Sequence, residues 1–360
     1  MPRRLDVNYE GNSAYTIYIE RDFTRLGDRL GELGTEGRKA LLVTDENVAP
    51  LYLEELLARL AAHFALVEYL ILPAGEEYKN TRSVERIYEK AVEAGFDRRD
   101  FFLALGGGVV GDMTGFAAAS YMRGVRFLQF PTTLLAQVDS SIGGKTGVDF
   151  REYKNMVGAF HMPSLVYSAV STLSTLDRRQ FASGMGEVIK HALIRSHTYF
   201  DYLLAHIEAL TRREGEVLEE TVYRSNQIKR EIVERDPREQ GERQLLNFGH
   251  TLGHAIESCS GFSCTHGQCV AYGCLASLSI APALSEKELS ELYRLFSGVG
   301  LSTRLVPMDI ASILRAAKKD KKMDGGQVRF ILLRRLGEAY IERAVPAEKL
   351  ERALRALMED

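Results

Sequence analysis

The chain has 360 residues, of which 45% are hydrophobic and 26% are charged, and its formal net charge at pH 7 is −3. This length exceeds what one hydrophobic core usually supports, so we expect two domains. The near-neutral charge excludes a general nucleic-acid binder, which would carry a basic stripe. The sequence has no run of about 18 apolar residues and no apolar core after its first arginines. We therefore expect a cytoplasmic protein without a membrane partner.

Short apolar or β-branched runs alternate with helical patterns in the first half of the chain. The predicted strands are residues 15–19, 40–44, 66–72, 101–105 and 125–130. Between them, two segments carry apolar side chains at helical spacing, at 50–63 and 81–94. This alternation predicts an α/β domain with a mostly parallel sheet, in which ligand-facing loops follow the strands.

A glycine-rich turn follows the fourth predicted strand, with the sequence GGGVVGD from Gly106 to Asp112. Glycines let the backbone approach a pyrophosphate, and the N-terminus of a following helix favours its charge. The spacing does not match the G-x-G-x-x-G fingerprint, so a tight turn with Asp112 as a helix cap is the plainer alternative. Polar residues at 132–133 and a polar loop at 139–146 favour the phosphate-binding interpretation, because they follow the next strand.

The second half of the chain reads as nearly all helix from about residue 176, with long charged segments at 199–236 and 285–296. One exception is the stretch 327–333, whose β-branched and aromatic residues predict a hairpin with 339–342. We therefore expect an α/β domain over 1–170 and an all-helical domain over 171–360.

Three candidate zinc ligands lie in this second half, namely Glu187, His250 and His266. His250 and His254 are four residues apart and would share one helix face, so spacing alone leaves open whether His254 or His266 is the second imidazole. The glutamate of an H-E-x-x-H site is absent, and a lone helical histidine is usually structural. For Glu187 the plainer alternative is a surface ion pair with Lys190.

Cations and an amide are interleaved with these candidate ligands. They are Lys190, Lys229, Arg243 and Asn247, with Lys145 and Lys154 in the first half. A metal beside an anion pocket indicates chemistry on a phosphorylated or carboxylated small molecule. Arg243 and Asn247 precede His250 by seven and three residues, so a single helix would place all three near one face.

Nearly the whole chain resembles the 3-dehydroquinate synthase family of sugar-phosphate cyclases. The matching stretches are TDENVAPLY (44–52), PAGEEYKN (73–80), GGGVVGDMTGFAAASYMRG (106–124), FPTTLLAQVDSSIGGKTGVD (130–149), KNMVGAFHMP (154–163), GEVIKH (186–191), LLNFGHTLGHAIE (245–257), HG (266–267) and DKK (320–322). The resemblance implies an N-terminal α/β domain that binds NAD and a C-terminal helical domain that binds metal and substrate, in a homodimer.

The resemblance also implies a role for each matching residue. It makes Glu187, His250 and His266 the metal ligands, for Zn²⁺ or Co²⁺ as a substitute. The implied NAD contacts are Asp45, Asn47, Glu76, Lys79, Gly107, Gly108, Val109, Asp112, Thr132, Thr133 and Lys154. The implied substrate contacts are Arg123, Asp139, Lys145, Asn155, Lys190, Lys229, Arg243, Asn247, His254 and one of Lys321 and Lys322. The implied catalytic residues are His254, Lys145, Lys190, Arg243, Asn247 and, as an acid/base candidate, Glu239.

The reaction implied by the resemblance converts 3-deoxy-D-arabino-heptulosonate 7-phosphate, a small phosphorylated sugar acid, to 3-dehydroquinate and phosphate in the shikimate pathway. Its steps are oxidation by NAD, phosphate elimination, reduction, ring opening and an intramolecular aldol closure. The alternatives are another sugar-phosphate cyclase, such as an aminodehydroquinate synthase, or a metal-dependent polyol dehydrogenase, which would release NADH. The chain departs from the family pattern near the metal ligands, where Gly186 replaces the usual alanine.

Overall fold

The protein is described here by a computed structural model that covers residues 3–151, 153–261, 263–321 and 329–359. The chain forms two compact units, Met1–Leu176 and Asp177–Asp360. The predicted boundary after residue 170 falls in the short helix η6 (Val170–Ser174), which still belongs to the first unit. Within the covered residues, no helix is long and apolar enough to cross a membrane.

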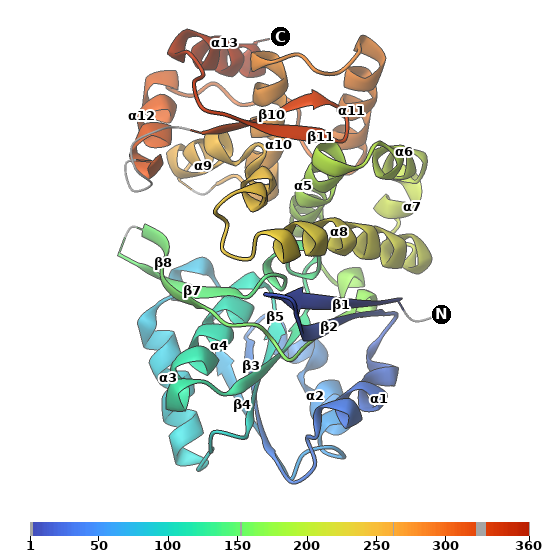
Figure 1. The fold of residues 1–360 in the computed structure, drawn as a ribbon, viewed down its shortest axis with the longest axis vertical. Helices are drawn as coiled ribbons and strands as arrows, with labels where there is room; N and C mark the ends of the chain where they lie inside the picture. Colours follow the sequence, from blue (N-terminus) through green and yellow to red (C-terminus); the bar gives the residue numbers. More distant parts are fainter. Residues whose placement is uncertain (1–2, 152, 262, 322–328, 360) are drawn as a thin grey trace. The chain divides into compact units, whose positions relative to one another are not determined.

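The first unit is built on a 7-stranded sheet with the order β1-β2-β9-β6-β5-β3-β4 (Figure 1). Its strands are β1 (Arg3–Tyr9), β2 (Asn12–Glu20), β3 (Lys39–Asp45), β4 (Leu66–Leu72), β5 (Phe101–Gly106), β6 (Arg126–Pro131) and β9 (Leu165–Ala169). Only β1 and β2 pair antiparallel, so the predicted mostly parallel sheet is confirmed. All five predicted strands are present, whereas β1 and β9 were missed.

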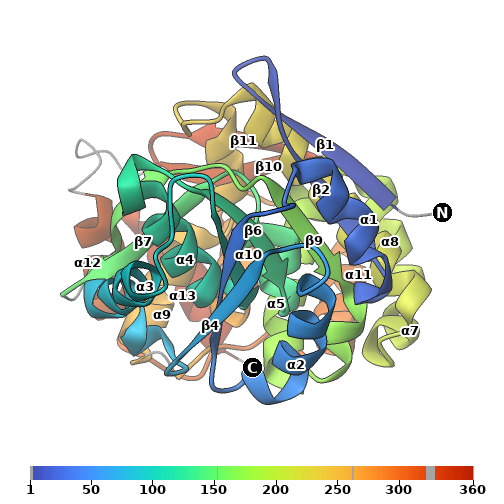
Figure 2. The same cartoon turned by 90° about the horizontal axis from the view of Figure 1, so that it is seen from below.

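Helices cover both faces of this sheet. They are η1 (Phe23–Arg25), α1 (Leu26–Leu30), η2 (Gly31–Leu33), α2 (Ala49–Leu60), η3 (Glu76–Tyr78), α3 (Thr81–Glu93), α4 (Gly108–Ser120), η4 (Tyr121–Arg123) and the π-helical turn η5 (Ala136–Ser140). In Figure 2, α1 and α2 lie on one side of the strands and α3 and α4 on the other. Leu56 of α2 shares a core with Leu42, and Ile87 of α3 shares the opposite core with Leu41, because successive strand residues face opposite sides.

The strand order reverses between β3 and β5. From β3 the chain passes through α2 to the outer strand β4, whereas from β5 it passes through α4 toward β6 in the other direction. Since α2 and α4 pack on opposite faces, the loops that follow β3 and β5 diverge. Such a switch point is where open α/β sheets bind ligands, beyond the carboxyl ends of the strands.

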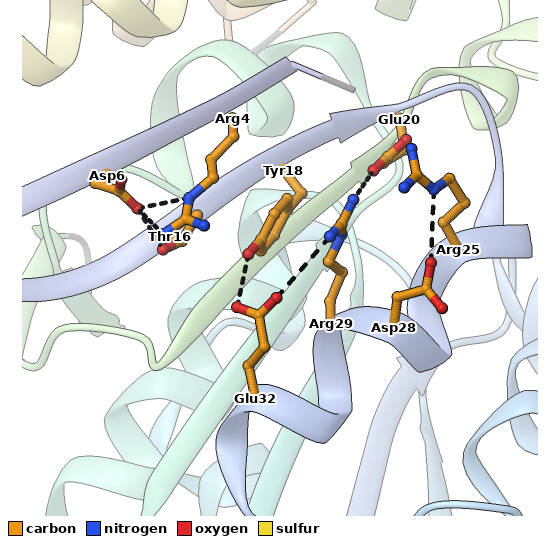
Figure 3. A network of polar contacts seen from close by, with 9 residues as sticks. All are labelled: Arg4, Asp6, Thr16, Tyr18, Glu20, Arg25, Asp28, Arg29 and Glu32. Atoms are coloured by element: carbon orange, nitrogen blue, oxygen red, sulfur yellow. Dashed lines mark hydrogen bonds and ion pairs between the residues drawn. The ribbon is translucent and has the colours of Figure 1, made fainter. Parts of the chain in front are cut away.

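A polar network covers the edge of the sheet at β1 and β2 (Figure 3). Arg4 and Asp6 of β1 form an ion pair of 2.9 Å. Tyr18 of β2 donates a hydrogen bond to Glu32 at 3.0 Å, and the Arg29 guanidinium lies 4.5 Å from the centre of the Tyr18 ring. These contacts join the edge hairpin to α1 and η2, and charged side chains on an edge strand oppose pairing with a further strand.

An antiparallel ribbon of β7 (Lys145–Phe150) and β8 (Tyr153–Phe160) packs against α4. The polar loop predicted over 139–146 is therefore wrong in part. Residues 136–140 form the π-helical turn, and Lys145 and Thr146 already pair in β7 with Phe160 and Ala159. The polar residues 145–146 are extended because they form hydrogen bonds with β8. The local sequence pattern contains no signal for this pairing with another strand.

The second unit is mainly helical. Its helices are α5 (Arg178–Arg195), α6 (His197–Ala205), α7 (Ile207–Thr211), α8 (Gly215–Arg235), η7 (Glu242–Asn247), α9 (His250–Cys259), α10 (His266–Ile280), α11 (Glu286–Gly298), α12 (Ile310–Lys321) and α13 (Ala347–Met358). The segment predicted at 199–236 is three helices, because the chain breaks at His206, between α6 and α7, and turns at Arg213, where φ is a left-handed 58°. The predicted hairpin is present as β10 (Phe330–Arg335) and β11 (Glu338–Glu342), although residues 327–328 lie outside the described chain.

Candidate functional site

Close packing of α5 against α10 places two of the predicted ligands together. Gly186 precedes Glu187 on α5, and Gly267 follows His266 on α10. A Cβ atom at Gly186 would lie 2.5 Å from the carbonyl oxygen of Gly267. Because that contact is with backbone, a larger residue would force the two helices apart. The glycine pair therefore fixes how near Glu187 comes to His266.

A second glycine, Gly249, lies at the start of α9, the helix that carries the predicted ligand His250. Gly249 has a φ of 79° and caps α9, whose first residue is His250. The chain breaks here, because Arg243 and Asn247 belong to the separate 3-10 helix η7. The expectation that one helix carries Arg243, Asn247 and His250 is therefore wrong. The left-handed turn at Gly249, which an L side chain would strain, redirects the chain between them.

The structure brings the predicted metal ligands into contact. Oε1 of Glu187 lies 3.3 Å from Nε2 of His266 and 3.5 Å from Nε2 of His250. His254 is the exposed member of a cluster in which the three imidazoles offer nitrogens within 4.8 Å of one another. Glu187 also forms an ion pair with Lys190, and both side chains are at most 1% exposed. The alternative of a surface ion pair is thus wrong.

The other ring nitrogens have partners that orient the imidazoles. Nδ1 of His250 lies 3.1 Å from the carbonyl oxygen of Phe248, and Nδ1 of His266 lies 3.3 Å from Oε2 of Glu257. Since both partners accept hydrogen bonds, each ring carries a proton on Nδ1, and Nε2, on the Glu187 side, is the nitrogen that a metal would bind. Apart from Lys190 and the two imidazoles, neither buried Glu187 oxygen has a polar partner among the described residues. This donor set fits a divalent cation.

The charges of the cluster also favour a cation. Burial opposes ionisation of Glu187, but Lys190 and the imidazoles hold the pKa of its carboxyl well below the usual range. Burial lowers the pKa of His250 well below its usual value and keeps that ring neutral. Burial opposes protonation of His266 as well, yet Glu187 and Glu257 raise its pKa to about 9. A metal ion would replace the proton held between these carboxylates.

The turn between α8 and η7 orders three further predicted residues. The Asp236 carboxylate accepts hydrogen bonds from backbone N–H groups of this turn, including that of Arg243 at 3.0 Å. The buried Arg243 side chain donates through Nη1 to the carbonyl oxygen of Pro237 at 2.6 Å. Asn247 donates to Oε1 of Glu239 at 2.7 Å. The turn thus holds a guanidinium, an amide and a carboxylate in defined positions.

Two residues that hold these groups were not predicted from the sequence. Glu257 lies seven residues after His250, or about two helical turns, so its place on the same face of α9 could have been found from spacing. Asp236 lies in a stretch that is polar throughout and gave no signal. Its role depends on the folded turn, in which one carboxylate meets several backbone N–H groups.

In the first unit, the glycine-rich turn forms a cradle at the carboxyl end of β5. Gly107 caps α4, and Gly108 is its first residue, so the alternative in which Asp112 caps the helix is wrong. A Cβ atom at Gly108 would lie 2.9 Å from Oγ of Ser140, and one at Gly107 would lie 3.2 Å from Cγ2 of Thr133. The N-terminus of α4 carries a positive partial charge and open N–H groups, which suit a phosphate.

Lys79 connects several of the predicted cofactor and substrate residues. Its Nζ lies 2.7 Å from Oδ2 of Asp112 and donates to Oδ1 of Asn155 at 2.5 Å. Beside it, Lys154 lies 3.7 Å from Glu76. Burial raises the pKa of Asp112 to about 6, although Lys79 opposes the rise. The structure thus joins residues of η3, α4 and β8 into one charged cluster.

Four more predicted residues lie where β3 and β6 end. Asp45 closes β3, and its carboxylate accepts the backbone N–H of Asn47 at 2.9 Å. After β6, the N–H of Thr132 donates to the carbonyl oxygen of Gly106 at 3.0 Å, and Thr133 follows it. Both strands flank β5, so these residues lie beside its carboxyl end, where a ligand at the switch point is expected.

Left-handed backbone marks three predicted residues. Arg123, Asn155 and Glu239 have φ values of 67°, 53° and 59°. Such strain in residues other than glycine clusters at functional sites.

The other predicted substrate residues lie on separate elements. Asp139 lies in η5, Lys145 begins β7, and Lys229 is buried on α8. Lys321 ends α12, while Lys322 lies outside the described residues.

Fold and site together define a class of protein. A doubly wound α/β unit with a glycine-rich turn at its switch point is joined to a helical unit in which a buried carboxylate lies beside imidazoles. Two family models match consecutive parts of the chain, 3-dehydroquinate synthase N-terminal at residues 69–183 and 3-dehydroquinate synthase C-terminal at residues 184–323. The chain belongs to the 3-dehydroquinate synthase family.

Relatives and solved structures agree with this assignment. The 3-dehydroquinate synthase of Ruminiclostridium cellulolyticum is 42% identical over 340 residues, which cover 94% of each chain. The structure of 2-epi-5-epi-valiolone synthase from Streptomyces hygroscopicus, with NAD⁺ and Zn²⁺ bound, has a TM-score of 0.87 and 29% identity, and the match covers 98% of this chain and 99% of that one. A 2-deoxy-scyllo-inosose synthase shares the fold, with a TM-score of 0.89, 24% identity and coverage of 99% and 100%.

Proposed function

We propose that the protein converts 3-deoxy-D-arabino-heptulosonate 7-phosphate to 3-dehydroquinate and phosphate. The observation that carries this proposal is the buried Glu187 carboxylate facing Nε2 of His250 and His266, in a chain of this family. One carboxylate and two imidazoles leave coordination positions for substrate oxygens, as in catalytic zinc sites. Zinc is therefore the proposed metal and NAD the proposed cofactor, both of which are bound in the valiolone synthase structure.

The residues around the metal pocket suit the proposed chemistry. When bound, the metal would acidify a substrate hydroxyl, and NAD would accept a hydride from the carbon that bears this hydroxyl and later return it. Lys190 keeps Glu187 ionised and places a positive charge beside the reacting oxygens. His254 is the exposed imidazole of the cluster, so it is the residue proposed to move protons between substrate and solvent.

Substrate binding is assigned to cationic and amide side chains. The substrate carries a carboxylate and a phosphate. The planar guanidinium of arginine and the compact ammonium of lysine both bind such groups. The ordered turn that holds Arg243 and Asn247 gives them fixed directions, and Arg243 is proposed to grip one anionic group. The other residues proposed to contact substrate are Arg123, Asp139, Lys145, Asn155, Lys190, Lys229 and one of Lys321 and Lys322.

NAD binding is assigned to the first unit. The N-terminus of α4 at Gly107 and Gly108 is proposed to bind the pyrophosphate, because glycine leaves the space that a Cβ atom would fill. Asp112 lies in the first turns of the same helix and forms an ion pair with Lys79, the residue that follows η3. The other proposed contacts are Asp45, Asn47, Glu76, Val109, Thr132, Thr133 and Lys154.

We also propose that the protein is a cytoplasmic homodimer, as the family resemblance implies. Sedimentation equilibrium of the purified protein tests the oligomeric state, and a mass of one chain at all concentrations would contradict it. Fractionation of the source cells tests the location, for which recovery with the soluble cytoplasmic fraction is expected.

The activity itself is tested with the heptulosonate phosphate and a trace of NAD. We expect release of phosphate and formation of 3-dehydroquinate, loss of turnover after dialysis against a chelator, and recovery when Zn²⁺ is added. His250→Ala and His266→Ala should lose bound metal together with activity. Full turnover of metal-free protein would contradict the proposal, and so would undiminished zinc affinity in both variants.

A further inference from the structure

We infer that Glu257 is a positioning residue for the metal site, which fixes the His266 ring so that its Nε2 faces the metal. The inference rests on the proposed metal binding and adds a residue outside the ligand set. Its basis is the distance of 3.3 Å between Oε2 of Glu257 and Nδ1 of His266. This contact lies on the opposite side of the ring from the 3.3 Å approach of Nε2 to Glu187.

The helix α9 supplies both a ligand and this support. His250 is its first residue, and Glu257 lies about two turns later on the same face. The Glu257 side chain is only 11% exposed. A carboxylate is costly to bury unless it is paired and hydrogen-bonded, so its direction toward His266 on α10 is a specific arrangement between two packed helices.

The two imidazoles differ in what holds them. Nδ1 of His250 faces the backbone carbonyl of Phe248, which is neutral and cannot be removed by substitution. Nδ1 of His266 instead faces a carboxylate, which is a stronger acceptor than a carbonyl. A carboxylate that accepts the Nδ1–H proton fixes the tautomer and increases the donor strength of Nε2. Glu257 therefore makes His266 the more firmly oriented imidazole of the pair.

Three variants of the full chain test this role. Glu257→Ala removes the acceptor, whereas Glu257→Gln removes the charge but keeps an oxygen that can accept the Nδ1–H proton. Glu291→Gln is the matched control, because it removes a charge from α11 at a side chain that is 26% exposed and pairs with Lys287. Zinc affinity is measured by competition with a chelator, and the metal geometry is followed in the absorption spectrum of Co²⁺-loaded protein.

We expect Glu257→Ala to weaken zinc binding roughly 10–100-fold and to shift the Co²⁺ bands, because the ring can then rotate or change tautomer. Glu257→Gln should lose less affinity than Glu257→Ala, and Glu291→Gln should match wild type in both measurements. Wild-type affinity and spectrum in Glu257→Ala and Glu257→Gln would overturn the inference while leaving metal binding intact. A wild-type protein that binds no zinc would instead overturn the proposed function, and this inference with it.

Discussion

Arg243, the residue proposed to bind an anionic group of the substrate, is a buried charge held in place by the turn around it. Its side chain is 3% exposed, and one of its nitrogens is fixed by the carbonyl oxygen of Pro237. A guanidinium presents its donors in a planar fork whose geometry suits a carboxylate or a phosphate. Asp236 holds the backbone of the same residue. The cation is therefore oriented before substrate arrives.

Replacing Arg243 should separate anion binding from metal binding. We predict that Arg243→Ala lowers kcat/KM by a factor equivalent to about 2–4 kcal/mol of lost transition-state stabilisation, the range for losing a buried charged hydrogen bond. Its zinc content should stay near normal. Arg243→Lys should recover only part of the loss, since an ammonium cannot bind two oxygens in parallel. Steady-state kinetics and metal analysis are the measurements. Wild-type turnover in Arg243→Ala would contradict the substrate pocket, and loss of zinc would make Arg243 a structural support.

At Asp112, burial and an ion pair act in opposite directions. Burial raises the pKa to about 6 from an ordinary 3.8, even though Lys79 lies 2.7 Å away. The folded protein therefore binds this proton more tightly than the unfolded chain. The resulting stability is full below about pH 4 and is lost as the pH rises through about 6.

The comparison of wild type with Asp112→Asn tests that balance, because the amide does not titrate. We predict that the Tm of wild type, relative to that of Asp112→Asn, rises as the pH is lowered from about 7 to about 5. Thermal unfolding of both proteins in matched buffers gives this difference. A difference that falls instead would mean that the Lys79 ion pair outweighs burial and depresses the pKa of Asp112.

Among the structural elements, α5 and α10 depend on glycine for their close approach. A Cβ atom at Gly186 would meet the backbone of Gly267, one residue from each of two proposed ligands. We predict that Gly186→Ala destabilises the protein by roughly 1–3 kcal/mol, as overpacking does, and weakens zinc binding by moving Glu187 from His266. Gly215→Ala is the control, since a Cβ atom there meets nothing within 4 Å on α8. Equal stability and zinc affinity in the two variants would contradict this account.

Sequence periodicity predicted the elements that depend on local pattern and missed those that depend on partners. The run 66–72 is apolar except for Glu68 and the run 101–105 is wholly apolar, and β4 and β5 lie where they were predicted. By contrast, β1 carries the charged sequence RRLDVNY and becomes a strand through its pairing with β2. The break at Gly249 and the turn held by Asp236 likewise depend on tertiary contacts.

For the candidate site, the sequence predicted the residues that could bind a metal but not the orientation of their rings. Spacing suggested Glu187 and His250 as metal ligands and left open whether His254 or His266 was the second imidazole. The family resemblance assigned that place to His266. The structure brings Glu187, His250 and His266 together and leaves His254 exposed at the cluster. Spacing could not reveal which ring nitrogen faces the metal, because the partners of Nδ1 come from other turns and helices.

Across the whole molecule, the proposed reaction divides its chemistry between the two units. The first supplies a phosphate cradle for NAD, and the second supplies the metal pocket and the buried cations Lys190, Lys229 and Arg243. The proposed oxidation and reduction cancel within one turnover, so NAD acts as a bound catalyst. A polyol dehydrogenase with a similar fold would instead release NADH in every cycle.

The central claim is tested most directly by following a hydrogen label at the substrate carbon that is oxidised. Heptulosonate phosphate deuterated at that carbon is incubated with the protein and a trace of NAD, and the product is analysed by mass spectrometry and NMR. We predict one phosphate released per product, no accumulation of NADH, and deuterium retained at the same carbon. Loss of the deuterium from the product, with NADH formed in step with turnover, would contradict a closed redox cycle and favour a dehydrogenase.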